Sequence, residues 1–350
     1  MKSRTAIQFK VGGALVIDEV CITDPDPDQV LIKLHATGIC HSQLHQMRDP
    51  KLKRPLVLGH EATGIVEKKG KNVTHVREGD HVVLTWMNPL PAKTKKSDIS
   101  KHFMSPLQTI NKDLVHGVFI YTWGEHVTVR GGYVFPISKD YPTDVTSILG
   151  CAVATGCGAV MNTANVLPGN SVAVFGAGGV GLSAICAASI LGAYPIIAVD
   201  SDSAKEPIAK SFGATHFVKA GDNAIENIKE LTGGRGVEYS FDAVGAPAVQ
   251  EEAYKAARPG GAFVIVGVAP KGSETKFPGL DIHANEKRIL GCFFGSTDPY
   301  REFPRLLQLY RTGQLMVDEL ISQRYPLSQI NEAYADLLKG GHKRGVLVMG

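Results

Sequence analysis

Three side chains of the kinds that bind metal ions stand out in the sequence. Cys40 and His60 lie in the first part of the chain, and Cys151 follows later. Two cysteines and one histidine, with water in the fourth position, form a ligand set typical of catalytic zinc. Each residue also has a structural interpretation, because a free cysteine often fills a core and a histidine often serves as a hydrogen-bonded polar residue. Spacing alone leaves both interpretations open.

A second chemical signal is a glycine-rich turn. The β-branched run 171–175 predicts a buried strand, and it leads directly into Gly176, Gly178 and Gly181 with the spacing G-x-G-x-x-G. Glycines in this pattern let a phosphate group approach the backbone closely. From Gly179 onward the apolar spacing predicts a helix, whose free N-terminal N–H groups would point at the phosphates.

An acidic residue follows at the distance that a dinucleotide site requires. A second strand, 195–199, ends on Asp200, about 20 residues beyond Gly181. A carboxylate at this place accepts hydrogen bonds from the adenosine ribose hydroxyls and repels a 2′-phosphate. The alternative is an ordinary turn with Asp200 as a helix cap. The strand-turn-helix-strand context favours a dinucleotide site that takes NAD rather than NADP.

Length and composition limit the class of protein. The chain has 350 residues, which fits two domains, and 44% of them are hydrophobic. A net charge of +3 without a long run of like charge indicates neither a nucleic-acid partner nor a membrane surface. No apolar segment reaches the roughly 20 residues of a membrane span, and the N-terminus lacks the apolar core of a signal peptide. We therefore expect a cytoplasmic protein whose six cysteines form no disulfide framework.

The elements that must position these residues fall into two groups. Residues 1–150 hold short alternating runs broken by glycine and proline, which predicts a turn-rich β domain. Residues 171–293 alternate strands with helices, which predicts an α/β fold with a parallel sheet covered on both faces. The pieces after residue 293 fit best with the first domain. The predicted division is a catalytic domain at 1–152 and 294–350 and an inserted cofactor domain at 153–293.

Individual elements can be predicted within this division. Strands of the parallel sheet are expected at 171–175, 196–200, 216–218, 239–243 and 262–268. A connecting helical stretch is expected at 142–161, with later helices at 302–312 and 330–339 and a final strand at 345–349.

Motifs in a fixed order run through nearly the whole chain. They are Gly-Ile-Cys-His-Ser (38–42), Gly-His-Glu-Ala-Thr-Gly (59–64), Leu-Gly-Cys (149–151), Val-Phe-Gly-Ala-Gly-Gly-Val-Gly (174–181), Phe-Asp-Ala-Val-Gly (241–245) and Lys-Arg-Gly-Val-Leu (343–347). This order resembles the zinc-dependent medium-chain alcohol dehydrogenases. The resemblance implies a GroES-like β-rich catalytic domain and a Rossmann cofactor domain with a doubly wound parallel sheet.

The resemblance also implies one catalytic zinc per chain. Its ligands would be Cys40, His60 and Cys151, with Glu61 behind the metal as a transient ligand. Two thiolates and a neutral imidazole balance the charge of Zn²⁺. The metal still acts as a Lewis acid that lowers the pKa of an alcohol before hydride leaves.

Further roles follow from the same resemblance. Ser42 would bond the substrate hydroxyl and pass its proton through the cofactor ribose to His45. His41 and Arg344 would meet the pyrophosphate, and Thr155 would contact the nicotinamide amide. The remaining cofactor-binding residues would be Gly176, Gly178, Gly179, Val180, Gly181, Asp200, Lys205, Val266 and Val268, with Lys205 beside Asp200 at the ribose.

The sequence departs from the family pattern in a lobe that often carries a second, structural zinc. Four cysteines are expected there, but the corresponding positions are Leu90, Lys93, Lys96 and about Met104. The four-thiolate site cannot form with these residues. We expect segment 88–113 to be a reshaped loop held by packing or by a partner subunit.

A second departure is Gln43, where many relatives have an aspartate that accepts a hydrogen bond from the zinc histidine. A glutamine can accept that bond from His60 but lacks the charge that raises the basicity of the imidazole. Metal affinity is the property that this change affects.

The two tryptophans, Trp86 and Trp123, fall where the resemblance places aromatic residues of the substrate pocket. Simple core packing is the alternative. If they line the pocket, a primary alcohol or aldehyde, including an aromatic one, fits better than a polyol, because a polyol needs polar partners.

The function expected from these features is reversible hydride transfer between such an alcohol and NAD. Two alternatives remain open: a zinc-free quinone or enone reductase, and a catalytically silent NAD-binding protein on the same fold. The zinc-free reductase is disfavoured because its chemistry has no use for the metal-ligand set. The small-molecule substrate would be the main partner, within a homodimer or a tetramer.

Overall fold

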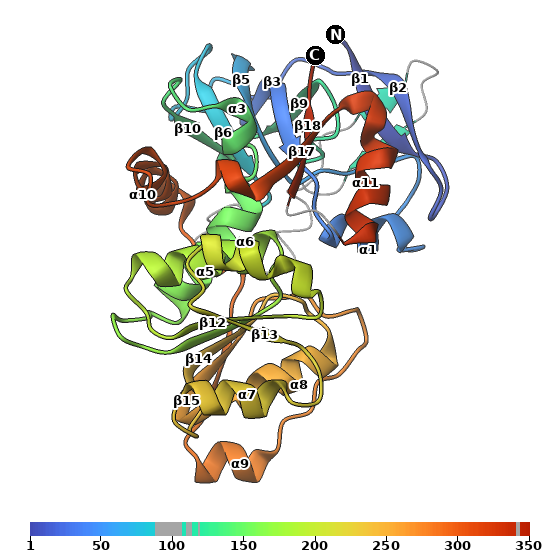
Figure 1. The fold of residues 1–350 in the computed structure, drawn as a ribbon. Helices are drawn as coiled ribbons and strands as arrows, with labels where there is room; N and C mark the ends of the chain where they lie inside the picture. Colours follow the sequence, from blue (N-terminus) through green and yellow to red (C-terminus); the bar gives the residue numbers. More distant parts are fainter. Residues whose placement is uncertain (88–106, 110–113, 118–119, 341–343) are drawn as a thin grey trace. The chain divides into compact units, whose positions relative to one another are not determined.

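The computed structural model describes residues 1–87, 107–109, 114–117, 120–340 and 344–350. The chain forms two compact units (Figure 1). Unit 1 contains Met1–Cys151 and Ile321–Gly350, and unit 2 contains Ala152–Leu320. Unit 2 is therefore inserted into the sequence of unit 1. None of the described helices combines the length and the hydropathy that a membrane span needs.

Unit 1 is built from β-strands. One sheet runs in the order β10-β6-β5-β3-β18-β17, with β9 also paired to β3, and a small closed barrel has the order β1-β2-β7-β8-β4. Their bounds are β1 (Lys2–Gln8), β2 (Leu15–Cys21), β3 (Gln29–Gly38), β4 (Leu56–Val57), β5 (Glu61–Lys69), β6 (His81–Thr85), β7 (Leu107–Thr109), β8 (Leu114–Gly117), β9 (His126–Arg130), β10 (Val134–Ile137), β17 (Ile321–Pro326) and β18 (Arg344–Val348).

The C-terminal segment completes the large sheet of unit 1. Strand β18 pairs antiparallel with β3, with Val346 opposite Gly38, and parallel with β17. Helix α11 (Ile330–Lys339) connects these two strands and packs its apolar face into the core of unit 1 through Ile330, Ala333 and Tyr334. The other short helices of unit 1 are α1 (Ser42–Arg48) and α3 (Thr143–Thr146). The last residues of the chain therefore lie beside the segment that carries Cys40.

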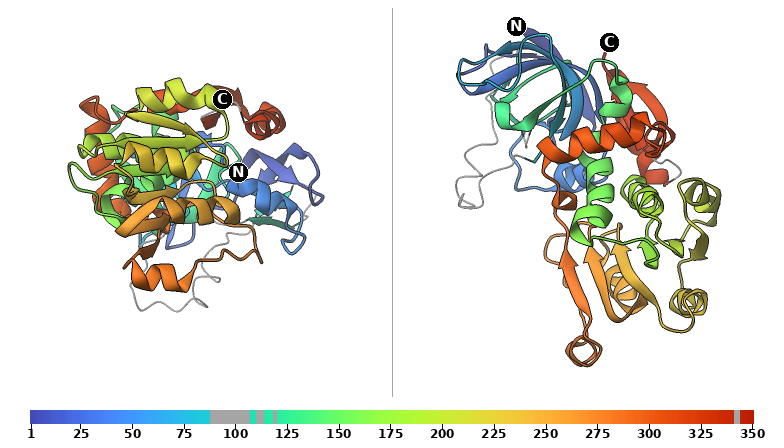
Figure 2. Two further views of the ribbon diagram at one scale, coloured as in Figure 1. Left: turned by 60° about the horizontal axis from the view of Figure 1, so that its bottom comes forward. Right: turned by 90° about the vertical axis from the view of Figure 1, so that its left-hand side faces the viewer.

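Unit 2 contains the parallel sheet that the alternating sequence predicts. The strand order is β13-β12-β11-β14-β15-β16, which is the doubly wound order of a Rossmann sheet, so the predicted α/β class is confirmed. Figure 2 shows helices packed along this sheet in two further views. The strands are β11 (Val172–Phe175), β12 (Ile196–Asp200), β13 (His216–Lys219), β14 (Val237–Asp242), β15 (Ala257–Ile265) and β16 (Arg288–Gly291). The helices are α4 (Ala154–Gly158), α5 (Gly179–Ile190), α6 (Glu206–Ser211), α7 (Ala224–Leu231), α8 (Pro247–Ala256), α9 (Gly279–Ala284) and α10 (Pro299–Arg311).

Two features of unit 2 differ from the sequence expectation. The edge strand β16 was not predicted, because its only apolar residues, Ile289 and Leu290, are adjacent and show no strand pattern. The inserted domain was expected to end at residue 293, whereas unit 2 continues through Leu320 and includes α10. This helix packs against α4 of unit 2, which explains why the compact unit is longer than the alternating strand-helix pattern.

A buried polar chain lies at the β5–β6 pair of unit 1. His81 is almost completely buried, and its Nε2 lies 2.7 Å from the Thr63 hydroxyl. Thr63 in turn donates to the Val82 carbonyl, so the His81 nitrogen acts as the donor. Burial lowers the pKa of His81, and the nearby His35 and Lys139 act in the same direction, against a bond involving the Ser138 backbone. The folded protein therefore holds this imidazole neutral.

The lowered pKa predicts a pH-dependent loss of stability. The unfolded chain binds a proton at His81 more readily than the native state does, so the free energy of unfolding should fall as pH drops below about 6.5. His81→Gln keeps a donor for Thr63 but does not titrate. Urea unfolding between neutral and mildly acidic pH should show a flatter profile for this variant than for the wild type. Parallel profiles would contradict a role for His81.

Candidate metal centre and cofactor loop

Four side chains of metal-ligand type meet in unit 1. Ligand atoms of Cys40, His60, Glu61 and Cys151 all lie within 4.8 Å of one another. His60 and Glu61 are buried, and the two cysteines are half-buried. The His60 Nε2 lies 3.3 Å from the Cys151 sulfur. These residues come from three segments: the turn between β3 and α1, the entry to β5, and the end of the first part of unit 1.

The backbone before β5 is shaped so that His60 and Glu61 enter the site. Gly59 has a φ of +107°, and a Cβ at this position would collide with the backbone of Thr122. The carbonyl of Glu61 accepts a 2.6 Å hydrogen bond from the Thr37 hydroxyl and a longer one from Thr122. Both threonines are fully buried. This pair of hydroxyl groups fixes the two ligands with neutral partners.

Cys151 lies in an irregular helical segment. Residues Leu149–Val153 form a π-helix, a rare geometry that occurs often at functional sites. The Gly150 carbonyl accepts a 2.6 Å hydrogen bond from the buried Thr85 hydroxyl at the end of β6. A side chain at position 150 would also collide with the Leu84 carbonyl. Close packing against β6 therefore sets where Cys151 lies.

The two thiol groups behave as a coupled pair. The Cys151 thiol donates to the Cys40 sulfur, which lowers the pKa of Cys40 well below its usual value and raises that of Cys151. His60 and Arg344 also stabilise the Cys40 thiolate. The Trp86 indole donates to the Cys151 sulfur and acts to lower its pKa. A donor set of two thiols and one imidazole suits Zn²⁺, which displaces the thiol protons on binding.

Glu61 is held behind this set by an ion pair. Its carboxylate is completely buried and contacts the guanidinium of Arg344, the first residue of β18. Gly38 leaves the space for it, because a Cβ there would lie 2.5 Å from the Glu61 Oε1 atom. The structure pairs Arg344 with Glu61, and the predicted contact of Arg344 with a pyrophosphate stays a prediction.

Gln43 does not take the place expected for it. Its Oε1 accepts a 2.5 Å hydrogen bond from the hydroxyl of Tyr334 on α11. The expected bond from His60 is not found among the described residues, and the side chain reaches toward α11 instead. The sequence carried no signal for this partner, because Tyr334 lies almost three hundred residues away along the chain.

The predicted proton-path residues lie at the start of α1. The Ser42 hydroxyl is 3.3 Å from the Cys40 sulfur, which places it at the metal-ligand cluster. The rings of His41 and His45 meet edge to face with centroids 5.7 Å apart, and both residues are exposed. Burial lowers the pKa of His41, and His45 adds to this effect. The helix therefore joins a group beside the ligands to an imidazole in contact with water.

The cofactor loop in unit 2 has the geometry that the glycines predict. Helix α5 begins at Gly179, and a Cβ on Gly181 would overlap the Gly176 carbonyl. Asp200 at the end of β12 turns its carboxylate to this loop, where Oδ2 accepts a 2.7 Å hydrogen bond from the Ala177 N–H. The Lys205 ammonium lies 3.1 Å from the same oxygen. The strand, glycine turn, helix and acidic residue thus form one constellation.

The other predicted residues lie in varied surroundings. Thr155 is in α4, and Val268, which follows β15, is 70% exposed. Val180 lies in the first turn of α5, and Val266 comes directly after β15. Trp123 is fully buried in the core of unit 1, where its ring packs against Tyr334 at 5.3 Å between centroids. The structure thus gives Trp123 the core-packing role, whereas Trp86 contacts the Cys151 sulfur.

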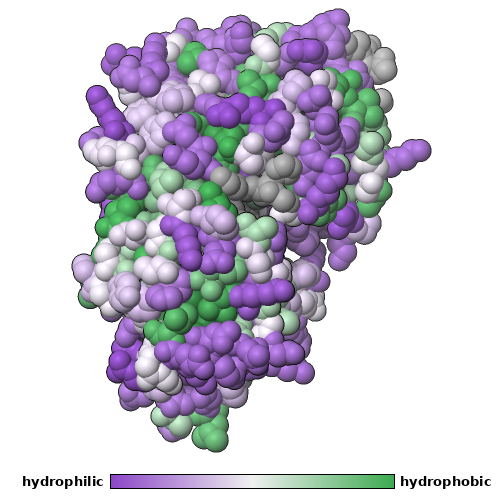
Figure 3. Space-filling view, viewed as in Figure 1, coloured by the Kyte–Doolittle hydropathy of each residue, from purple (hydrophilic) through white to green (hydrophobic). Residues whose placement is uncertain are grey.

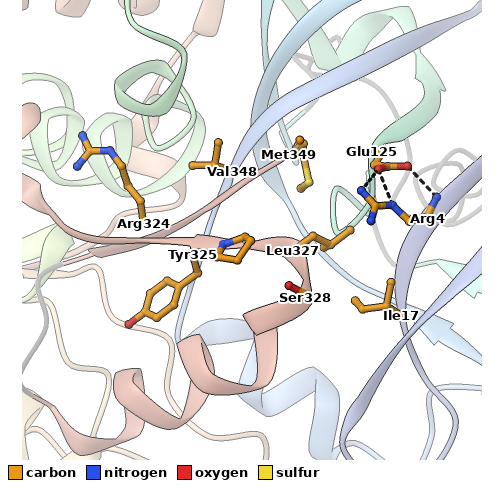
Figure 4. A pocket seen from close by; sticks show the side chains of 11 residues that line it. Arg4, Ile17, Glu125, Arg324, Tyr325, Leu327, Ser328, Val348 and Met349 are labelled. Carbon is orange, nitrogen blue, oxygen red and sulfur yellow. Dashed lines mark hydrogen bonds and ion pairs between the residues drawn. The ribbon is translucent and has the colours of Figure 1, made fainter.

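Another hollow of unit 1 carries no comparable chemistry. It has a volume of about 380 Å³ and is lined by residues of β17, the C-terminal end and β1 (Figure 4). Its two arginines are already paired, Arg4 with Glu125 and Arg324 with Asp144. The metal-ligand cluster lies outside it, so this hollow is not the candidate active site.

Comparison with known proteins places these features in a family. Residues 26–139 match the alcohol dehydrogenase GroES-like domain, and residues 179–312 match the zinc-binding dehydrogenase domain. The chain belongs to the zinc-binding alcohol dehydrogenases. It is 34% identical to alcohol dehydrogenase 1 of Pisum sativum, covering 100% of this chain and 97% of the relative. It is 32% identical to the NDMA-dependent alcohol dehydrogenase of Amycolatopsis methanolica, covering 99% of each.

The solved structures agree with this family assignment. The benzyl alcohol dehydrogenase of Acinetobacter calcoaceticus superposes with a TM-score of 0.92 at 31% identity and covers 100% of both chains. The GroES-like and Rossmann folds predicted from the motifs are confirmed, as is the assignment to oxidoreductases. The positions that replace the structural-zinc cysteines, 90 to 104, lie outside the described residues.

Several residues of this alcohol dehydrogenase site were missed from the sequence. Thr37, Thr85 and Thr122 hold the ligand backbones, and Tyr334 reaches the same region from the C-terminal segment. Threonine is a common residue, so the residue type alone did not mark these three positions. Their roles depend on contacts between distant segments.

The space beside Gly38 gives a prediction about metal retention. Gly38→Ala would force the buried Glu61 carboxylate away from its place and weaken the ion pair with Arg344. We expect a loss of about 1–3 kcal/mol in unfolding free energy together with a lower zinc content. Gly279→Ala in α9 is the matched control, because a Cβ there meets no atom within 4 Å. Equal behaviour of the two variants in urea unfolding and metal analysis would contradict the packing argument.

Proposed function

We propose that this protein is an NAD-dependent zinc alcohol dehydrogenase that interconverts a primary alcohol, including aromatic ones, and its aldehyde. The observation that carries the proposal is the meeting of Cys40, His60 and Cys151 within 4.8 Å, with Glu61 behind them. A zinc-free reductase on the same fold has no chemical use for such a set. A catalytically silent protein has no use for a proton path from the Ser42 hydroxyl to the exposed His45.

Cys40, His60 and Cys151 would hold one zinc ion, with Glu61 as a transient ligand. A zinc ion at this place would supply Lewis-acid chemistry that lowers the pKa of an alcohol and polarises a carbonyl. The residues fit this ion because two thiolates and a neutral imidazole are its preferred donors. Arg344 keeps the Glu61 charge balanced in the resting protein.

The protein's own groups would move the proton. The Ser42 hydroxyl, beside Cys40, would accept the alcohol proton while its own proton leaves toward His45. His45 lies three residues later on the same helix and is exposed to water, where it can release the proton. His41, whose ring contacts that of His45, would stand beside this exit and toward the pyrophosphate.

The cofactor would be NAD, bound at the loop between β11 and α5. Asp200 would determine the preference for NAD over NADP, because its buried carboxylate would accept bonds from the ribose diol and repel a 2′-phosphate. Lys205, whose ammonium lies 3.1 Å from the Asp200 Oδ2 atom, would contact the same ribose. Thr155, Val266 and Val268 would line the nicotinamide part of the site.

The proposed substrate class rests on one residue beside the metal-ligand cluster and on one similar solved structure. Trp86, in contact with the Cys151 sulfur, would place an aromatic wall beside the metal. The similar structure from Acinetobacter calcoaceticus is a benzyl alcohol dehydrogenase. Both observations favour an apolar primary alcohol over a polyol.

The active form would be a homodimer, with a tetramer as the alternative. Strand β16 is the outer strand of its sheet, and Phe293 directly after it is 69% exposed. Leu280 on α9 is 78% exposed, and Figure 3 shows apolar surface at the bottom of the view, where α9 lies in Figure 1. An open strand edge with apolar neighbours favours pairing with a second copy.

The proposed chemistry predicts the effect of losing one ligand. Cys40→Ser should reduce NAD reduction with benzyl alcohol by more than about 1,000-fold and remove bound zinc, since one thiolate is lost. NADH binding, followed by fluorescence, should remain because Cys40 lies outside unit 2. Elemental analysis should find one zinc per wild-type chain. Full activity in the variant, or two firmly held zinc ions in the wild type, would refute the proposal.

The carboxylate at Asp200 predicts cofactor preference. Catalytic efficiency with NADP should be at least ~100-fold lower than with NAD, because a phosphate dianion would face the Asp200 carboxylate, whose charge the single ammonium of Lys205 does not reverse. Asp200→Ala should bring the two catalytic efficiencies closer together, mainly by lowering the efficiency with NAD. The measurement is kcat/KM for both cofactors in both proteins. Similar efficiencies in the wild type would show that the carboxylate faces another group.

A further inference from the structure

Tyr334 links the C-terminal helix to the segment that carries Cys40. Its hydroxyl donates a 2.5 Å hydrogen bond to the Gln43 Oε1 atom, and the backbone N–H of Gln43 donates a 3.2 Å bond to the Cys40 carbonyl. Tyr334 and Gln43 are both buried, and no water can replace either partner without entering the core. The Tyr334 hydroxyl is therefore linked through Gln43 to the turn 39–43 that carries Cys40, the metal-ligand turn.

The C-terminal segment also forms a hydrogen bond with the same turn at a second point. The N–H of Ile39 donates a 2.9 Å hydrogen bond to the carbonyl of Gly345, where β18 runs beside β3. Tyr334 and Gly345 thus fix the backbone on both flanks of the Cys40 sulfur. Trp123 packs edge to face on the Tyr334 ring and restricts its rotation.

The side-chain amide of Gln43 has an unused hydrogen-bond donor, which points to a role beyond packing. Its Nε2 group is buried and has no hydrogen-bond partner among the described residues, so its amide is held by Tyr334 alone. A buried amide with one partner is costly unless its position serves another group. The neutral side chain also adds no charge beside the thiolates of Cys40 and Cys151.

We propose that Tyr334 and Gln43 form a neutral clamp that positions Cys40 and slows the release of zinc from this site. The inference rests on the proposed function only for the presence of the metal. Tyr334 is a positioning residue, since it acts on Cys40 through Gln43. The clamp replaces a charged partner of the metal-ligand turn with a chain of two neutral hydrogen bonds.

Zinc release from the holoenzyme tests this clamp directly. Tyr334→Phe removes one oxygen atom, keeps the packing against Trp123 and leaves the Gln43 side chain without its hydrogen-bond partner. Transfer of zinc to an excess of a chromogenic chelator at neutral pH should be about 10–100-fold faster than in the wild type. In the cobalt-substituted protein, the thiolate charge-transfer bands should shift, because the Cys40 sulfur is less firmly placed.

Tyr325→Phe is the matched control. Tyr325 is a buried tyrosine of the same C-terminal segment, and its hydroxyl donates a 3.0 Å bond to Asp336, away from the metal-ligand turn. Its loss should lower the unfolding midpoint while zinc release stays within about twofold of the wild type, since no partner of the metal ligands changes. Gln43→Leu and the double variant Tyr334→Phe/Gln43→Leu complete a cycle. The two changes should be strongly non-additive in the release rate, because they remove one shared bond.

Each outcome bears on the proposal. Zinc release from Tyr334→Phe at the wild-type rate, with a loss of stability like that of Tyr325→Phe, would show a merely structural role and overturn the clamp. Additive effects in the cycle would overturn the link to Gln43. A wild-type chain without zinc would overturn both the clamp and the proposed function. Zinc binding without alcohol oxidation would overturn the proposed function alone, since the release experiment needs no turnover.

Discussion

The gathering of two thiols, an imidazole and a carboxylate in one poorly solvated place is the constraint on which unit 1 depends. Bringing these groups together is unfavourable unless a cation or shared protons compensate the charge. Cys151 lowers the pKa of Cys40, while Cys40 raises that of Cys151, and Arg344 faces Glu61. A divalent metal ion is the partner that satisfies the donor set as a whole. The surrounding fold must hold the ligands together both with and without it.

The fold meets this demand with neutral groups on rigid elements. Thr37 and Thr122 hold the Glu61 backbone, and Thr85 holds the Gly150 carbonyl beside Cys151. Hydroxyl donors fix the backbone without adding charge near the thiolates. The large sheet supplies the rigidity, since its central strands β3 and β5 carry ligands at their ends. Ligand loops anchored at strand ends move less than free loops do.

The sequence was informative where local pattern or residue type decides the outcome. The β11–α5 turn and Asp200 follow a short, local motif, and the structure brings them together. Cys40, His60 and Cys151 were named through an ordered set of motifs, and they converge in space. The order of strands in unit 2 follows from alternating strands and helices, which allow few parallel arrangements. Strand β16 was not predicted, because it is fixed by its pairing with β15 and not by a hydrophobic pattern in its own sequence.

The partners of buried polar groups could not be predicted, because they depend on contacts across the chain. Gln43 was expected to serve His60, yet its oxygen goes to Tyr334 from the far end of the sequence. Arg344 lies against Glu61, a contact that the sequence did not indicate, and its role at a pyrophosphate stays a prediction. Trp123 packs beside Tyr334 in the core, which agrees with the core-packing alternative. Each of these contacts joins segments that lie far apart in the sequence.

Charge balance gives these departures a common reason. Arg344 offsets Glu61, and the thiolates of Cys40 and Cys151 offset a dication, so the site with zinc is formally neutral. A carboxylate at position 43 would add a negative charge that nothing nearby compensates, whereas Gln43 adds none. The neutral site then gains charge only from what the substrate brings, and its affinity for the metal depends more on hydrogen-bonded geometry than on surrounding charge. In the proposed clamp, Tyr334 supplies that geometry through its bond to Gln43.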